Sequence, residues 1–94
     1  MSDKTNEFYS RLREQLENTS GWPSKYLYKF VVPTVQEKIE QVYVVFDNMG
    51  AVINTTASKT GKYTSISVEV QMQSPDHVIE KYKEVSNIEG ILSL

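Results

Sequence analysis

The sequence predicts an α+β sandwich in which two helices cover one face of a four-stranded antiparallel sheet, with an additional helix at the N-terminus. Three observations predict it. Residues 63–73 alternate between apolar and polar side chains, which is typical of a strand with one buried and one solvated face. Residues 26–32 form a second run of aromatic and β-branched side chains. Each run is followed by a segment of helical periodicity.

Composition limits the possible partners. The chain has 94 residues, no cysteine, and twelve acidic against ten basic side chains. A chain of this length forms one domain that buries only about 60 to 65% of its unfolded surface, so a second copy could supply further burial. The absence of cysteine fits a reducing compartment, and we expect a cytoplasmic protein. No apolar run approaches the ~20 residues of a membrane span, and a net charge of −2 does not attract nucleic acid. We therefore expect neither a membrane nor a nucleic-acid partner.

An N-terminal extension, residues 1–23, precedes the sandwich. Residues 5–18 carry an apolar stripe with a spacing of four, made of Phe8, Leu12 and Leu16. Residues 18–21 end this helix, and Trp22-Pro23 follows as an extended hinge. Because the stripe is short, the helix needs a surface to cover. We expect it to lie across part of the exposed sheet or to dock on a second subunit.

The first strand and the first helix of the sandwich follow. Pro33 ends the strand 26–32, because proline cannot donate a ladder hydrogen bond. Thr34 is then placed to cap a helix, with Glu37 completing a capping box. The apolar positions of this helix are Val35, Ile39, Val42, Phe46 and Met49. Residues 42–46 could also form a strand by propensity, but the caps, including Gly50 at the C-terminal end, favour the helix.

The second half repeats this order. Residues 51–57 form a weaker strand that turns at residues 59–61 into the strand 63–73. Ser74 caps the next helix, with Pro75 at its first position. That helix extends to about Asn87, and its buried face carries Val78, Ile79, Tyr82 and Val85. Residues 88–94 form the last strand. Right-handed crossovers then give a ferredoxin-like βαββαβ domain over residues 24–94, with sheet order 4-1-3-2.

Short motifs resemble a known family. They are Tyr28-Lys29-Phe30, then Ser58, Gly61, Tyr63 and Ser65 around the hairpin, and residues 79–85 with Tyr82. From about Tyr26 onward the chain resembles the YbeD-like family, a bacterial domain of unknown function. The resemblance implies an ACT-like ferredoxin-type fold with no established activity. ACT domains that bind amino acids commonly place a glycine and an acidic residue after the first strand, whereas this chain has Val32-Pro33-Thr34 there.

One candidate binding surface emerges from the strand pattern. If Tyr28 and Phe30 face the core, Lys29 lies on the open face near Ser65 and Ser67 of the neighbouring strand. The adjacent hairpin adds Ser58, Lys59, Lys62 and Tyr63. Together these side chains could hold a small anion or the carboxylate of a partner. The alternative is a solvated Lys29 that pairs weakly with Glu69.

The sequence predicts no catalytic, metal or cofactor residues. His77 is the only histidine, whereas protein metal sites need three or four ligands. Ser58, Ser65 and Ser67 lack an activating base in the sequence pattern. We therefore expect a regulatory or adaptor module that binds protein through its open sheet face or a free strand edge. Edge pairing by the uncharged strand 51–57 would give a homodimer. The alternative is an ACT-type sensor of an amino acid or another metabolite.

Overall fold

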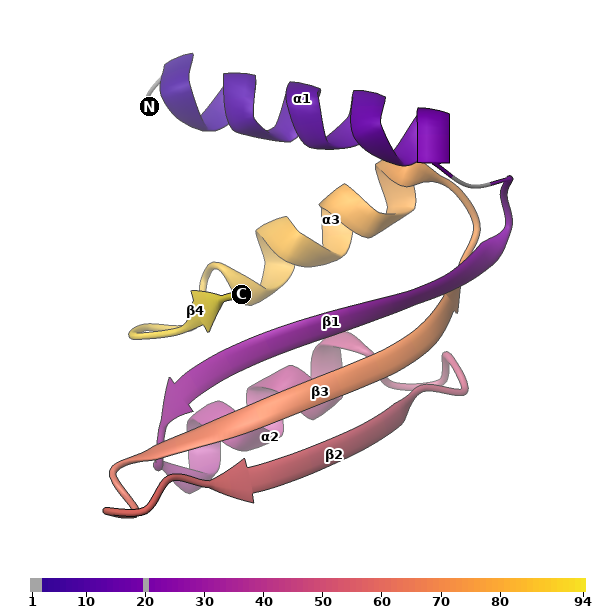
Figure 1. Cartoon of the computed structure of the whole chain (residues 1–94). Helices are drawn as coiled ribbons and strands as arrows, with labels where there is room; N and C mark the ends of the chain where they lie inside the picture. The colour runs from indigo at the N-terminus through magenta and orange to yellow at the C-terminus, as the bar shows by residue number, and fades with distance from the viewer. Residues whose placement is uncertain (1–2, 20) are drawn as a thin grey trace.

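The structure, a computed structural model, describes residues 3–19 and 21–94. The elements in chain order are α1 (Asp3–Thr19), β1 (Ser24–Pro33), α2 (Gln36–Val45), β2 (Val52–Ala57), β3 (Tyr63–Met72), α3 (Pro75–Val85) and β4 (Leu92–Ser93). The strands form one antiparallel sheet in the order β2-β3-β1-β4 (Figure 1). This confirms the ferredoxin-like α+β arrangement and the predicted strand order. Residues 1, 2 and 20 of the predicted extension lie outside the described residues.

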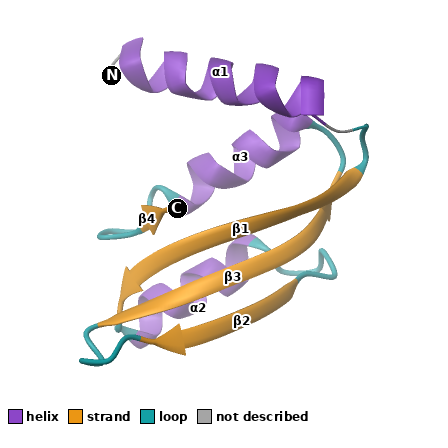
Figure 2. Cartoon of the chain, viewed as in Figure 1, coloured by secondary structure: helices purple, strands orange, loops and turns teal. Residues whose placement is uncertain are grey.

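The pairing of β1 with β3 forms the centre of the sheet. The register extends without interruption from Ser24 opposite Met72 to Pro33 opposite Tyr63. Along both strands buried side chains alternate with exposed or partly exposed ones, as the period-two pattern predicts. One face of the sheet is therefore the core, and the other face carries the polar positions of β3. Figure 2 shows α2 behind the strands, with no helix in front of them.

The core is aromatic at its centre. Tyr28, Phe30 and Phe46 are almost fully buried, and the rings of Tyr28 and Phe46 lie 4.9 Å apart between centroids. The other buried core side chains are Val32, Val42, Ile66, Val68, Val70, Met72, Val78, Val85 and Ile88. Residues from both central strands and from both covering helices thus meet in one cluster, which fixes the sheet orientation.

The helix α2 is shorter than predicted. It begins after Val35, which makes no side-chain capping bond, and it ends at Val45. The capping box at Thr34 is wrong, because the Thr34 hydroxyl instead bonds the Thr64 hydroxyl of β3 at 2.9 Å. After Phe46 the chain forms a turn in which Asn48 and Gly50 have positive φ angles of 61° and 70°. A left-handed residue unwinds the helix, so the predicted last turn to Met49 is not helical.

The last helix follows the prediction and the last strand does not. Ser74 Oγ accepts the backbone N–H of His77 at 3.2 Å, and Pro75 occupies the first turn, as the capping pattern predicts. The strand predicted over residues 88–94 is reduced to Leu92–Ser93. Ile88 is buried in the core and Ile91 packs against it, so these residues are held by burial and not by strand pairing.

The helix α1 packs on α3 of its own chain. Arg13 Nε pairs with Asp76 of α3 at 2.9 Å, and Lys83 Nζ lies 5.3 Å from the centroid of the Tyr9 ring. Leu16 packs against the core, and its carbonyl accepts the Trp22 indole N–H at 3.1 Å. The expectation that α1 lies across the open sheet face is therefore wrong. In the described ranges, every helix is too short or too polar to span a bilayer.

Candidate functional site

The open sheet face presents its side chains in rows that run across the strands. Lys29 of β1 lies opposite Ser67 of β3, and Ser67 lies opposite Asn54 of β2. The next row brings together Val31, Ser65 and Thr56 in the same way. Side chains directly opposite on one face of antiparallel strands are about 4.5 to 5.5 Å apart at Cβ. The two rows therefore form one continuous patch beside Lys29 that is polar except for Val31.

A hollow of about 380 Å³ lies in this patch. Its side-chain and backbone lining comes from Lys29, Phe30, Asn54, Thr56, Ser65, Ile66, Ser67 and Leu94. Three of the predicted surface residues, Lys29, Ser65 and Ser67, thus meet here. The hollow offers one cation surrounded by hydroxyl and amide groups, which suits a carboxylate or another small anion. The contributions of Asn54 and Thr56 were missed by sequence reasoning, because they depend on the register of β2 against β3.

Lys29 belongs to neither of the ion pairs found among residues 3–19 and 21–94. Those pairs are Arg13–Asp76 and Lys81–Glu84, both on the helical side. Glu69 lies opposite Leu27, one row away from Lys29, so the predicted weak pair is not formed. The ammonium group of Lys29 is left to solvent or to an incoming anion.

The hairpin residues play a different part. Ser58 N–H donates to the Tyr63 carbonyl at 2.8 Å, and Tyr63 N–H donates to Ser58 Oγ at 3.2 Å. These bonds close the turn, in which Gly61 has a φ of 75°. Lys59, Lys62, Tyr63 and Ser58 do not line the hollow. The structure therefore separates the predicted surface into a patch beside Lys29 and a basic hairpin tip at one end of it.

Apolar side chains surround the polar patch. Leu27 of β1 is 53% exposed, Val52 of β2 is 55% exposed, and Leu92 and Leu94 are 60% and 76% exposed. Val52, Glu69 and Leu27 occupy one row, while Leu92 lies opposite Val31. Exposed apolar groups beside a polar patch are typical of surfaces that contact other proteins.

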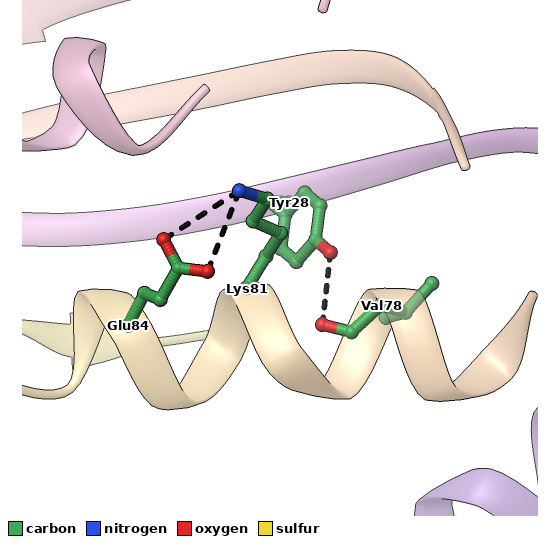
Figure 3. A network of polar contacts seen from close by, with 4 residues as sticks. All are labelled: Tyr28, Val78, Lys81 and Glu84. Atoms are coloured by element: carbon green, nitrogen blue, oxygen red, sulfur yellow. Dashed lines mark hydrogen bonds and ion pairs between the residues drawn. The ribbon is translucent and has the colours of Figure 1, made fainter. Parts of the chain in front are cut away.

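Three tyrosine hydroxyls on the helical side of the sheet have hydrogen-bond partners. Figure 3 shows the Tyr28 hydroxyl donating to the Val78 carbonyl of α3, at 3.0 Å, beside the Lys81–Glu84 pair. Burial raises the pKa of Tyr28 far above its ordinary value, and the neighbouring Tyr82 and Tyr26 add to the shift. Burial also raises the pKa of Tyr82, whose hydroxyl bonds that of Tyr26 at 2.8 Å. Tyr28 and Tyr82 are therefore neutral hydrogen-bonding groups of the core.

His77 has a local structural bond. Its Nδ1 accepts the backbone N–H of Gln73 at 3.2 Å, just before α3. Within the described part of the chain, no group of three or more His, Cys, Asp or Glu side chains could hold a metal ion.

The fold and this surface define a class: a small ferredoxin-like sandwich with one helix-covered and one uncovered sheet face. The chain belongs to the DUF493 family, described as a protein of unknown function, whose profile matches residues 17–94. The YbeD-like resemblance is thereby confirmed, and it begins earlier than Tyr26 because the match includes the end of α1. Searches of curated proteins and of solved structures gave no match.

Proposed function

We propose that this chain is a non-enzymatic adaptor or regulatory module of the cytoplasm that binds protein through its open sheet face and forms a homodimer through β2. The observation that carries the proposal is the combination of a polar patch and exposed apolar side chains on one sheet face. Protein interfaces combine apolar and polar contacts, and this face offers both, with the polar groups at its centre and the apolar groups around them.

The edge strand β2 supports the dimer. It lies at one end of the sheet order, and none of its six residues is charged. Edge strands that avoid pairing usually carry lysine, proline or bulges, and β2 has no lysine or proline. Two copies could join antiparallel along β2 and form one continuous sheet, which extends the open face across both copies.

Light scattering with a lysine variant tests the dimer. Thr55→Lys introduces a charge at the middle of β2, and two such charges would face each other near the twofold axis. We expect the wild-type protein to scatter as a dimer at high concentration and the variant as a monomer. Gln41→Lys, on an exposed position of α2, is the charge-matched control and should leave the dimer intact. A wild-type monomer at high concentration would refute the dimer.

Partner binding through the open face has its own test. Ser67→Arg places a bulky side chain over the hollow without touching the buried face of β3. We expect a bound partner, recovered from native lysate with the wild-type chain, to be lost with Ser67→Arg. Glu80→Arg on the exposed side of α3 is the control. Equal recovery with both variants would exclude the open face as the contact.

A small-molecule sensor is the second candidate, and the hollow beside Lys29 favours it. A carboxylate could pair with the lysine while the hydroxyls of Ser65 and Ser67 donate further hydrogen bonds to its oxygens. Thermal shift against amino acids and other carboxylates tests this, since a ligand at 100 times its Kd adds ~2.7 kcal/mol of stability. A shift that disappears in Lys29→Met would establish the sensor, and no shift with any compound would exclude it.

A further inference from the structure

The outer edge of β1 is largely unpaired. The strand β1 covers ten residues, but β4 pairs only with Phe30 and Val31. The Leu94 N–H adds one bond to the Lys29 carbonyl at 2.8 Å. Within the described residues, the stretch 24–28 therefore has no strand partner on this side. Figure 1 shows β4 as a short arrow beside one part of the long strand β1.

The backbone N–H and C=O groups of alternate residues on this edge point away from β3. In an antiparallel ladder, every second residue directs both its N–H and its C=O to the same side. Since the Lys29 carbonyl points to β4, the groups of Leu27 and Lys25 point to the same outer edge. Four polar backbone groups thus lie in the arrangement that an added strand requires.

The helical side of this edge is hollowed and apolar. A cavity of about 500 Å³ lies between α1, α3 and the end of β4. Phe8, Leu12, Tyr26 and Tyr82 contribute to its lining, and Ser86 and Ser93 add to it. An added strand about 4.8 Å from β1 would direct alternate side chains toward this cavity. Those side chains should be apolar, because the cavity offers mostly aromatic and aliphatic contacts.

The other side of the same edge is basic. Lys25 and Lys29 are exposed on the open face, and Leu27, 53% exposed, lies between them. Side chains of an added strand that alternate to this face would lie beside the two ammonium groups. Acidic side chains there would gain opposite-charge cross-strand contacts. Opposite charges also speed the encounter of the two chains.

We propose that the outer edge of β1 binds an extended peptide segment of a partner protein in which apolar and acidic residues alternate. A second copy of this chain fits the edge poorly. Antiparallel pairing centred on Leu27 would place Lys25 opposite Lys29 of the other copy, and like charges directly opposite are destabilising. The proposal goes beyond the open-face and β2 contacts and does not depend on them, because it concerns the part of β1 that β4 leaves unpaired, on the side of the sheet away from β2.

Fluorescence anisotropy with synthetic peptides tests the proposal. The probe is a labelled peptide of about eight residues that alternates valine and glutamate, and its counterpart alternates valine and lysine. We expect the glutamate peptide to bind the wild-type chain at least about tenfold more tightly at low salt, and this preference to decrease as salt increases. Equal affinity for both peptides, or binding of neither, would overturn the proposal.

Charge reversal locates the site. In the double variant Lys25→Glu/Lys29→Glu we expect the preference to change to the lysine peptide. The control Lys59→Glu/Lys62→Glu has the same net charge and alters only the hairpin tip, so it should keep the preference for glutamate. A control that reverses as the double variant does would show attraction by net charge alone and would overturn the proposal.

Hydrogen exchange on the wild-type chain gives a readout that needs no variant. The Leu27 amide should exchange quickly in the free protein, because it faces an unpaired edge. We expect the glutamate peptide to slow its exchange by at least about tenfold while the amides of β2 are unchanged. Unaltered exchange at Leu27 with peptide bound would refute strand addition at β1. Light scattering on the same samples reports the β2 dimer separately.

Discussion

Removing one buried hydroxyl should produce a stability change that depends on pH. The Tyr28 ring is fully buried, and its hydroxyl donates to the Val78 carbonyl at 3.0 Å. Tyr28→Phe keeps the ring and removes this bond, which contributes about 1 kcal/mol net. The carbonyl of Val78 lies within α3, where helical bonding also uses it, so it is not left unpaired. We expect the variant to be less stable than the wild-type protein by about 1 kcal/mol at pH 7.

The difference should vanish at high pH. In the unfolded chain the Tyr28 hydroxyl ionises near its ordinary pKa of 10.0, whereas burial raises the pKa of the folded state well above that. The stabilisation is thus complete below pH 10 and is lost as pH rises toward the folded pKa. One pH unit above 10.0, the unfolded state of the wild-type chain gains about 1.4 kcal/mol by ionisation, and the phenylalanine variant gains nothing there. Because this exceeds the difference of about 1 kcal/mol at pH 7, the two stability curves should cross between about pH 10 and 11.

Urea titrations followed by circular dichroism, at intervals between about pH 7 and 11, measure both curves. The contribution of Tyr82 is common to both proteins, so it cancels in the difference. Tyr63→Phe, at a half-exposed position on the open face, is the control and should change stability by less than about 0.5 kcal/mol at pH 7. Parallel curves for wild type and Tyr28→Phe up to pH 11 would show that Tyr28 is not protected from ionisation, and would refute the argument.

Three further predictions concern the framework. Ser74→Ala removes the cap of α3 and should cost about 1 kcal/mol in urea titrations; an unchanged midpoint would contradict the capping role. Removing residues 1–20 uncovers the side of α3 that α1 contacts, so the melting temperature in a calorimetric scan should fall. An unchanged melting temperature would show that α1 does not stabilise the domain. Gly61 and Gly90 both have positive φ, of 75° and 85°, so alanine at either position should cost about 1 kcal/mol in urea titrations. Gly90→Ala should cost more, because its Cβ would lie 3.0 Å from Cγ of Pro33; equal losses would contradict this steric contribution.

The sheet was predictable because its signals are local. The apolar and polar side chains that alternate along residues 65–72 are the buried and the exposed or partly exposed side chains of β3. Each apolar residue there therefore lies on the core face and each polar residue on the open face. The Ser74 cap is equally local, since it depends on a hydroxyl and an N–H three residues later. Thr34 shows the limit of this reasoning. Its hydroxyl finds Thr64, thirty positions away in sequence, and only the β1–β3 register brings the two together.

The candidate site was predictable in part for the same reason. Lys29, Ser65 and Ser67 follow from strand periodicity and the expected neighbours, so their meeting was visible in the sequence. The contribution of β2 depends on its register against β3, which no sequence pattern fixes. The position of α1 was missed because its apolar stripe specifies that it must be covered, but not by which surface. The surface that α1 covers is set by its tertiary contacts with α3, which include the Arg13–Asp76 pair.

The two free edges of the sheet differ in charge, and this difference determines whether the proposed β2 dimer and the proposed peptide contact at β1 can form together. One edge, β2, is uncharged and can meet an identical copy, whereas the β1 edge carries Lys25 and Lys29, which oppose self-pairing and favour an acidic strand. Because the unpaired part of β1 faces away from β2, a dimer joined through β2 would keep both of these β1 edges free on its two outer sides. Such a dimer is bivalent. A partner that carries two acidic-apolar segments should therefore bind it about 10² to 10⁴ times more tightly than one segment does, whenever its linker spans the sheet. With Thr55→Lys, the same partner should lose this gain while each segment keeps its own affinity, which separates avidity from the strength of the single contact.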